Sequence, residues 1–320
     1  MKIVIPDDYQ DAVRTLDCYA KLAAHDVTIY NDTVTDTAAL AERFRDADAL
    51  VLIRERTPID DALLAQLPRL RLIAQTGRGT AHIDTKACER RGIEVAVGTG
   101  SPIAPAELTW ALVMAAMRFL PQEVASARAG RWQSHLGRAL RGRTLGVYGY
   151  GKIGTLVAGY GRAFGMKVIV FGREGSLARA TSDGYLTTSR QELFSTSDAL
   201  SLHLRLTGET QGIVTRADLA SMKPDALLVN TSRAELIEEG ALVEALRAGR
   251  PGFAAVDVYE SEPWTEHPLL AMDNVLCTPH LGYVERDSYE LYFGQAFDAV
   301  NAWVFTTEAQ RTQRGTESSS

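Results

Sequence analysis

Short apolar runs alternate with segments of helical periodicity along the first hundred residues. The apolar runs have the length of buried strands and lie at Ile3–Ile5, Val27–Tyr30, Ala49–Ile53, Leu70–Gln75 and Ile93–Val97. Helical patterns separate them at Asp11–Leu22, Thr37–Phe44 and Asp60–Gln66. Strands that alternate with helices in this way predict a parallel sheet covered by helices.

The pattern changes at Gly98–Pro102, a turn-rich link that precedes a long apolar helix over Pro105–Leu120. Further strands are predicted near Val168–Phe171, Ala199–Leu204, Leu227–Asn230, Phe253–Val256 and Val275–Thr278, with helices such as Thr155–Phe164 and Ile237–Ala248. From Val284 apolar residues recur at helical spacing, so the chain is expected to return to the first domain.

This organisation predicts an α/β protein of two doubly wound parallel-sheet domains. The first is expected to be discontinuous, with residues 1–97 and 287–306, and the second to span 98–286. Residues 307–320 are polar and end in three serines, so we expect a disordered tail that buries too little apolar surface to fold alone.

Composition excludes several classes of function. The 320 residues are 46% hydrophobic and 23% charged, as in ordinary globular proteins, and a net charge of −6 argues against a nucleic-acid-binding surface. Met1-Lys2 lead directly into Ile3–Ile5 and no apolar run has the length of a membrane span, so neither a signal peptide nor a membrane association is expected. A cytoplasmic location follows as the expectation.

Three cysteines, Cys18, Cys88 and Cys277, are odd in number and far apart. Their spacing matches neither a disulfide framework nor a metal site, so we expect reduced core thiols and no bound metal.

An apolar strand beginning at Leu145 runs directly into a G-x-G-x-x-G turn made by Gly149, Gly151 and Gly154. In a dinucleotide-binding turn the first glycine permits the tight bend, the second lets the backbone approach the diphosphate, and the third lets helix pack on strand. The same pattern also occurs as a tight turn that binds nothing. The strand Val168–Phe171, which follows at βαβ spacing, favours the dinucleotide interpretation.

Three later stretches end predicted strands and carry reactive side chains: Asn230–Arg233, Asp257–Pro263 and Thr278–Gly282. Ligands bind beyond the carboxyl ends of strands in doubly wound sheets, so an arginine, a carboxylate and a histidine there form a candidate site. The alternative is a surface ion pair at Arg233, a solvated Glu262 and a histidine at the edge of the core.

Taken in order after the glycine turn, these stretches resemble the D-isomer-specific 2-hydroxyacid dehydrogenase family, which includes phosphoglycerate dehydrogenases and glyoxylate/hydroxypyruvate reductases. The resemblance extends to about Phe305 and includes Gly77–Gly79 with Ile83-Asp84, Ala106–Thr109, Trp132, Leu140–Gly146, His203-Leu204 and Met222–Pro224. It implies two Rossmann-like domains with the active-site cleft between them, a small-molecule 2-keto acid or 2-hydroxy acid substrate, and a homodimer built through the nucleotide domains.

The resemblance implies that His280 is the general acid/base, that Glu262 is its partner, and that Arg233 binds the substrate carboxylate and polarises its 2-keto group. The chemistry agrees, because a guanidinium supplies paired donors that stay charged, and an imidazole beside a carboxylate keeps a proton available near neutral pH. The related formate dehydrogenases place Gln where Glu262 stands, which disfavours that activity.

The same resemblance implies a cofactor-binding set. The backbone at Lys152 and Ile153 would meet the diphosphate, and Asp257 would lie by the nicotinamide carboxamide, unless it is only a strand-end cap. The predicted set is completed by Leu204, Thr231 and Ser232.

The chain departs from the common pattern of the family at several positions. Ala234 stands where Gly is usual, Arg205 where Pro is common, and Ala81-His82 where Asp-Asn is frequent, so the hydrogen bonds of the substrate loop are in question.

The most informative departure is Gly172-Arg173, where a ribose-binding acid usually follows the second strand. Without that acid, nothing repels a 2′-phosphate, and Arg173 can bind one. NADP(H) is therefore predicted to be preferred, with NAD(H) used less well. The alternative is that Arg173 stacks on adenine or points to solvent.

Two further arginines end strands of the first domain, Arg54 after Ala49–Ile53 and Arg78 in the loop Gly77–Gly79. The resemblance places both loops at the substrate, so Arg54, Arg78 and Gly79 are predicted to bind a substrate with polarity beyond its 2-keto acid group; the alternative is a pair of solvated loop cations.

A non-catalytic NAD(P) sensor or corepressor of the same fold is the rival function. The set Arg233, Glu262 and His280 favours an enzyme that works as a reductase.

Overall fold

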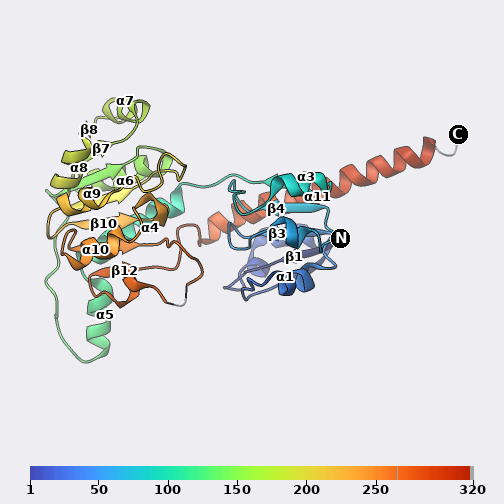
Figure 1. Ribbon diagram of the computed structural model, residues 1–320, viewed down its shortest axis with the longest axis horizontal. Helices are drawn as coiled ribbons and strands as arrows, with labels where there is room; N and C mark the ends of the chain where they lie inside the picture. The colour runs from blue at the N-terminus through green and yellow to red at the C-terminus, as the bar shows by residue number, and fades with distance from the viewer. Residues whose placement is uncertain (265, 318–320) are drawn as a thin grey trace. The chain divides into compact units, whose positions relative to one another are not determined.

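The computed structural model describes residues 1–264 and 266–317, with side chains up to residue 306. The chain divides into two compact units (Figure 1). Unit 1 consists of Met1–Ser101 and Glu285–Ser320, and unit 2 consists of Pro102–Val284. The sequence predicted boundaries at 97/98 and 286/287.

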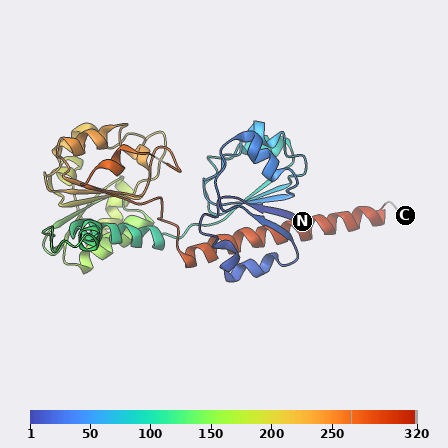
Figure 2. The ribbon, with the colours of Figure 1, turned by 90° about the horizontal axis from the view of Figure 1, so that it is seen from below.

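Unit 1 is built on a five-stranded parallel sheet of order β2-β1-β3-β4-β5. The strands are β1 (Lys2–Ile5), β2 (Asp26–Ile29), β3 (Ala49–Leu52), β4 (Leu72–Gln75) and β5 (Glu94–Val97). The helices are α1 (Thr37–Phe44), α2 (Asp61–Leu64), α3 (Thr85–Arg90) and α11 (Arg286–Glu317). Helices α1 and α2 pack on one face of the sheet through a layer of apolar side chains, and α11 runs along the opposite face (Figure 2). This placement puts the loops after β3 and β4 at one edge of the sheet.

The helical pattern at Asp11–Leu22 does not form one α-helix. Two 3-10 segments, Val13–Thr15 and Asp17–Leu22, replace it. Leu16 between them has extended backbone angles, φ −80° and ψ 143°, which no helix accommodates. The predicted helix over Asp11–Leu22 is therefore wrong.

Unit 2 is built on a seven-stranded parallel sheet of order β12-β11-β10-β9-β6-β7-β8. The strands are β6 (Thr144–Tyr148), β7 (Lys167–Phe171), β8 (Leu186–Thr187), β9 (Ala199–Leu202), β10 (Leu227–Asn230), β11 (Phe253–Val256) and β12 (Val275–Cys277). The order reverses between β6 and β9, which is where ligands bind in doubly wound sheets. The predicted α/β fold with two doubly wound parallel sheets is therefore confirmed.

Helices cover both faces of this sheet (Figure 2). The helices of unit 2 are α4 (Ile103–Met117), α5 (Leu120–Arg128), α6 (Lys152–Ala163), α7 (Glu174–Ser182), α8 (Arg190–Thr196), α9 (Arg216–Ser221) and α10 (Ala241–Arg247). α4 and α6 pack on one face around Trp110 and Val157, and α8, α9 and α10 pack on the other around Phe194 and Leu242. The two buried layers fix the strand ends that carry the candidate site.

α11 continues through most of the segment predicted to be a disordered tail. Its helix ends at Glu317, so the backbone of 307–317 is helical, and 318–320 lie outside the described residues. No single helix among the described residues is long and apolar enough to cross a membrane. One bent pair, α4 with α5 at 58°, meets the length and composition criteria together.

Candidate active site

The glycine turn of unit 2 has the geometry that the sequence predicted for it. Gly149 follows β6 with φ +97°, and a Cβ there would lie 2.5 Å from the carbonyl oxygen of His203. A Cβ on Gly154 would lie 2.1 Å from the carbonyl oxygen of Gly149. Only glycine fits at these two positions. A side chain on Gly149 would collide with the backbone after β9, and a side chain on Gly154 would push α6 away from the turn.

Gly151 differs from the other two glycines. It precedes α6 with extended backbone angles, and a Cβ there would meet no atom within 4 Å. The open space lies over the first turn of a twelve-residue helix, whose residues Lys152 and Ile153 have backbone N–H groups without intrahelical partners. A helix start with free N–H groups and open space beside it suits a diphosphate, so these residues fit a dinucleotide cofactor.

The end of β7 carries the predicted Gly172-Arg173 pair. A Cβ on Gly172 would make only an ordinary contact, 3.6 Å from the Cβ of Ser176, so a side chain is sterically allowed there. The Arg173 guanidinium is 74% exposed and lies 3.1 Å from a carboxylate oxygen of Glu209, which is 85% exposed. Arg173 therefore has a carboxylate partner that the sequence did not indicate.

His203 and Leu204 follow β9 beside the glycine turn. Leu204 is half-buried, and its methyl group would lie 2.9 Å from a Cβ on Gly149. The Nε2 atom of His203 lies 2.9 Å from the Ser201 hydroxyl, and its Nδ1 atom is buried without a hydrogen bond. Burial lowers the pKa of His203 to about 3, so its ring is neutral at physiological pH.

The segment after β10 is held by its own hydrogen bonds. The Asn230 side chain accepts from the backbone N–H of Ser232 at 3.1 Å and donates to the carbonyl of Arg233 at 2.8 Å. The Thr231 hydroxyl lies 2.6 Å from the hydroxyl of Thr109 on α4, and Ser232 donates to the Leu202 carbonyl at 2.7 Å. These contacts fix the backbone from which the Arg233 side chain extends.

Glu262 and His280 are in direct contact. His280 Nδ1 lies 2.5 Å from one Glu262 carboxylate oxygen, and the other oxygen accepts the Tyr259 backbone N–H at 2.9 Å. Burial raises the pKa of Glu262, but the hydrogen bond and charge of His280, with a smaller contribution from Arg233, hold it below its ordinary value. Glu262 is therefore ionised at neutral pH, and its carboxylate accepts a hydrogen bond from the Nδ1–H of His280.

Asp257 anchors the segment that carries His280. Its two oxygens accept hydrogen bonds from the Thr278 hydroxyl at 2.6 Å, the Leu281 N–H at 2.7 Å and the Gly282 N–H at 2.8 Å. Burial raises the pKa of this fully buried carboxyl group, although the three hydrogen bonds oppose the shift. These bonds hold a backbone in which His280 has a positive φ of 51°, a conformation that non-glycine residues adopt rarely. The strand-end role that the sequence left open for Asp257 is thus present in the structure.

Arg54 of unit 1 is tied to the loop after β4. It has φ +54°, its backbone N–H donates to the Thr76 hydroxyl at 2.9 Å, and its carbonyl accepts from Gln75 at 2.8 Å. Its guanidinium lies over the Tyr292 ring at 5.7 Å and 2.2 Å from where a Gly77 Cβ would stand. Gly77 itself has φ +122°, a backbone conformation that other residues rarely adopt, so its backbone favours glycine at this position.

Arg78 and Gly79 lie in the same loop. The Arg78 side chain is exposed, and a Cβ on Gly79 would lie 1.9 Å from a carboxylate oxygen of Glu55. Both ring nitrogens of His82 are buried without a hydrogen bond, and burial lowers its pKa. The side-chain hydrogen bonds that Ala81-His82 put in question are thus not made by His82.

Sequence reasoning did not single out Thr109, Glu209, Ser201 or Glu55. Thr109 lies in one of the motifs that carried the family resemblance, so that motif could have identified it. Glu209 is 36 residues from Arg173, and nothing in the local pattern connects the two.

All three cysteines are free, and burial raises the pKa of Cys18 to about 12 with a further contribution from Glu290. Among residues 1–264 and 266–317, no group of three or more His, Cys, Asp or Glu could hold a metal ion.

Comparisons with known proteins agree with this geometry. Residues 110–282 match the family model described as "D-isomer specific 2-hydroxyacid dehydrogenase, NAD binding domain". A glyoxylate reductase of Aeropyrum pernix is 41% identical over 78% of this chain and 77% of its own length. A D-3-phosphoglycerate dehydrogenase of Methanocaldococcus jannaschii is 37% identical over 88% of this chain, which spans only 53% of that protein.

A solved structure has the same fold over nearly its whole length. The crystal structure of a phosphoglycerate oxidoreductase from Vibrio cholerae is 53% identical, with a TM-score of 0.93 over 96% of this chain and 99% of that one. Together with the match of more than half the chain to the family model, these relatives establish the family. This chain belongs to the D-isomer specific 2-hydroxyacid dehydrogenases.

Proposed function

We propose that this oxidoreductase reduces a 2-keto acid to a D-2-hydroxy acid with NADP(H), and less well with NAD(H). Arg233 binds the substrate carboxylate and keto group, and His280, paired with Glu262, donates the proton. The observation that carries this proposal is the 2.5 Å contact between His280 and Glu262. A non-catalytic NAD(P) sensor would need no such acid/base pair.

The cofactor is proposed to be held by the glycine turn and by the residues around it. When bound, a reduced nicotinamide dinucleotide supplies a hydride. The proposed contacts are made by Gly149, Gly151, Lys152, Ile153, Gly154, Gly172, Arg173, Leu204, Thr231, Ser232 and Asp257. The preference for NADP(H) is supported by Gly172, which puts no carboxylate at the end of β7, and by Arg173 directly after it.

The protein side of the reaction is a binding step and a proton step. Arg233 offers a planar pair of donors to the substrate carboxylate, which orients the keto group. As negative charge develops on the keto oxygen, His280 gives it a proton from Nε2 while Glu262 stabilises the imidazolium through Nδ1. Asp257 holds the His280 backbone in place for this transfer.

Arg54, Arg78 and Gly79 are proposed to bind a polar group of the substrate beyond its 2-keto acid. Arg78 is exposed, and Arg54 lies against the loop that contains it. Hydroxylated, phosphorylated or dicarboxylic keto acids should therefore have a higher kcat/KM than pyruvate. Preference for pyruvate or branched-chain keto acids, unchanged by Arg54→Ala or Arg78→Ala, would exclude this role for the two arginines.

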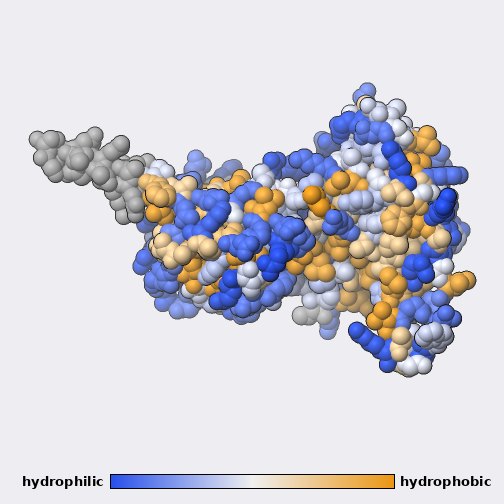
Figure 3. Space-filling view, turned by 180° about the vertical axis from the view of Figure 1, so that it is seen from behind, coloured by the Kyte–Doolittle hydropathy of each residue, from blue (hydrophilic) through white to orange (hydrophobic). Residues whose placement is uncertain are grey.

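We also propose that the chain forms a homodimer through unit 2. Trp132 and Leu136, in the segment after α5, are 86% and 92% exposed, which is unusual for large apolar side chains and suits contact with a second copy. Figure 3 shows apolar side chains among polar ones on the face of unit 2 that it presents. Sedimentation of the wild-type chain as a dimer and of Trp132→Glu as a monomer would support the proposal.

The activity is tested with both reduced cofactors and a panel of keto acids. Glyoxylate, hydroxypyruvate, phosphohydroxypyruvate, a dicarboxylic keto acid and pyruvate would be compared by the loss of reduced-nicotinamide absorbance. Turnover of at least one acid, lost in His280→Ala, is the expected result. Cofactor binding without turnover of any acid would favour the sensor.

A further inference from the structure

Unit 2 contains a cavity of about 250 Å³ that no part of the proposed reaction uses. Its walls come from four segments: the end of β10 with the residues after it, the start of α10, the end of β11 with the residues after it, and Pro268-Leu269. None of the residues proposed to bind substrate or cofactor lines it. The volume is close to the lower end of the range of roughly 300–1,000 Å³ in which small molecules bind.

Most of the residues that line this cavity are apolar, and three of its polar residues are acidic. Apolar side chains supply most of the lining, including Ala234, Ile237, Val243, Val256, Val258 and Leu269. Among the described residues, the charged or titratable ones in the lining are Glu238, Glu239, Glu260 and His267, and no described lysine or arginine lines the cavity. A ligand that suits both parts has an apolar body and a positive charge.

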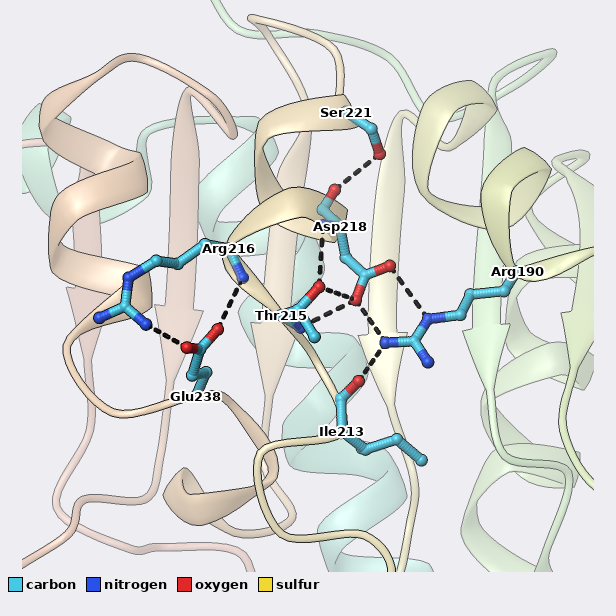
Figure 4. A network of polar contacts seen from close by, with 7 residues as sticks. All are labelled: Arg190, Ile213, Thr215, Arg216, Asp218, Ser221 and Glu238. Atoms are coloured by element: carbon cyan, nitrogen blue, oxygen red, sulfur yellow. Dashed lines mark hydrogen bonds and ion pairs between the residues drawn. The ribbon is translucent and has the colours of Figure 1, made fainter.

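The three carboxylates differ in how far they are already neutralised. Figure 4 shows Glu238 turned toward Arg216, which contacts it through both its backbone N–H and its guanidinium. Glu260 lies 3.2 Å from Nε2 of His267, and Nδ1 of His267 accepts the Leu269 N–H at 3.3 Å. Glu239 makes no side-chain hydrogen bond or ion pair with another described residue. Its carboxylate is therefore available to a cationic ligand.

The cavity adjoins the segments that carry the reaction. Asn230, a lining residue, bonds to the carbonyl of Arg233, and Ala234 follows Arg233 in the chain. Glu260 stands two residues before Glu262, the partner of His280. A molecule in the cavity thus touches the supports of Arg233 and Glu262 without touching either residue.

We propose that this cavity is an effector site for a small organic amine: a primary ammonium group at Glu239 and Glu260, with an apolar body among Val243, Val256 and Leu269. At liquid density the volume holds about eight to ten non-hydrogen atoms. Binding does not compete with the keto acid or the cofactor, because no residue is shared. Binding of the amine to the holoenzyme is independent of the proposed activity; its effect on turnover rests on that activity.

The site is tested by calorimetric titration of the full chain, saturated with NADPH, using 2-phenylethylamine. The matched ligand is 3-phenylpropionate, which has the same phenylethyl body and the opposite charge. The amine should bind and the carboxylate should not. Glu239→Gln should weaken the binding of the amine about tenfold, as expected for the loss of one charge-assisted hydrogen bond. Glu235→Gln is the control, because Glu235 lies in the same segment but outside the lining, and it should change the affinity for the amine less than twofold.

A second variant tests the place of binding. Val243→Trp puts an indole into the cavity and should abolish binding of the amine while the melting temperature stays near that of the wild type. If that variant does not fold, Glu239→Gln decides, because Glu239 is exposed and its loss leaves the core intact. Equal affinity for amine and carboxylate, or an unchanged affinity in Glu239→Gln, would overturn the site.

The effector role is tested by turnover. At concentrations of 2-phenylethylamine that saturate binding, kcat at saturating keto acid should change at least twofold in the wild type and should not change in Val243→Trp. If Val243→Trp does not fold, Glu239→Gln is measured instead, and its kcat should respond only at an amine concentration about tenfold higher than the wild type needs. Binding with an unchanged kcat would overturn the effector role while leaving the site. An enzyme inactive with every keto acid would refute the proposed function instead, and the calorimetric result would still stand.

Discussion

Replacing Glu209 with glutamine should increase the use of NADP(H) and leave the use of NAD(H) nearly unchanged. Glu209 lies 3.1 Å from the Arg173 guanidinium, the group proposed to bind the 2′-phosphate. The phosphate and the Glu209 carboxylate therefore compete for one cation. Glutamine keeps the size of the side chain and removes the competing charge.

The magnitude follows from the exposure of the pair. Both side chains are largely exposed, 74% for Arg173 and 85% for Glu209, so their ion pair contributes about 0.2–1 kcal/mol. Its removal should raise kcat/KM for NADPH by up to about fivefold. Arg173→Ala removes a charge-assisted contact of about 1.5–3 kcal/mol and should lower the same ratio about ten- to a hundredfold. Because NADH carries no 2′-phosphate, Glu209→Gln should change its kcat/KM less than twofold.

The assay measures kcat/KM for both cofactors at one fixed keto acid concentration and at low salt, where exposed charges are least screened. Glu174→Gln is the matched control, because it removes the same charge next to Arg173, and Glu174 makes no ion pair with another residue that the structure describes. Gly172→Asp combined with Arg173→Ala should shift preference to NADH. A wild-type enzyme that favours NADH tenfold or more, or a Glu209→Gln variant with reduced use of NADPH, would show that Arg173 does not bind the 2′-phosphate as proposed.

Three further predictions concern the same unit. Arg233→Ala should lower kcat and raise the KM for the keto acid together, because the guanidinium acts in both the bound and the transition state; a change in kcat alone would contradict this. Asp257→Asn should destabilise the chain by about 1–3 kcal/mol in urea unfolding and lower kcat, because the amide cannot accept all three hydrogen bonds. The pKa of His203 is lowered from 6.5 to about 3, so the unfolded chain binds a proton first as pH falls below 6.5 and stability falls by up to about 1.4 kcal/mol per pH unit between those values. His203→Gln should therefore show a shallower loss of stability over that range, and equal slopes would refute the burial of a neutral ring.

The sequence predicts most of the strands of this fold but only some of its helices. Thr37–Phe44 is found as predicted, because Asp36 caps it and one face is apolar. The helix predicted at Ile237–Ala248 is shorter, Ala241–Arg247, because Gly240 has φ +72° and cannot lie within a helix. The short polar helices α7, α8 and α9 carry too little periodic signal to be found from the pattern.

The candidate site divides in the same way. Strand ends can be read from the sequence, which is why Arg233, Glu262 and His280 could be named together. Contacts between residues far apart in the sequence cannot be predicted in this way, and the contact between Arg173 and Glu209 is an example. The positive φ of His280 likewise depends on Asp257, which lies 23 residues earlier in the sequence. Only the folded structure brings the Asp257 carboxylate into contact with the backbone next to His280.

The most direct measurement of the proposed chemistry is kcat of the wild-type chain and of His280→Ala, with glyoxylate and hydroxypyruvate as substrates and NADPH in excess. Equal melting temperatures of the two proteins would show that both are folded. Loss of the proton donor should lower kcat by about 10²–10⁴-fold. A His280→Ala variant with kcat near that of the wild type would show that His280 is not the proton donor.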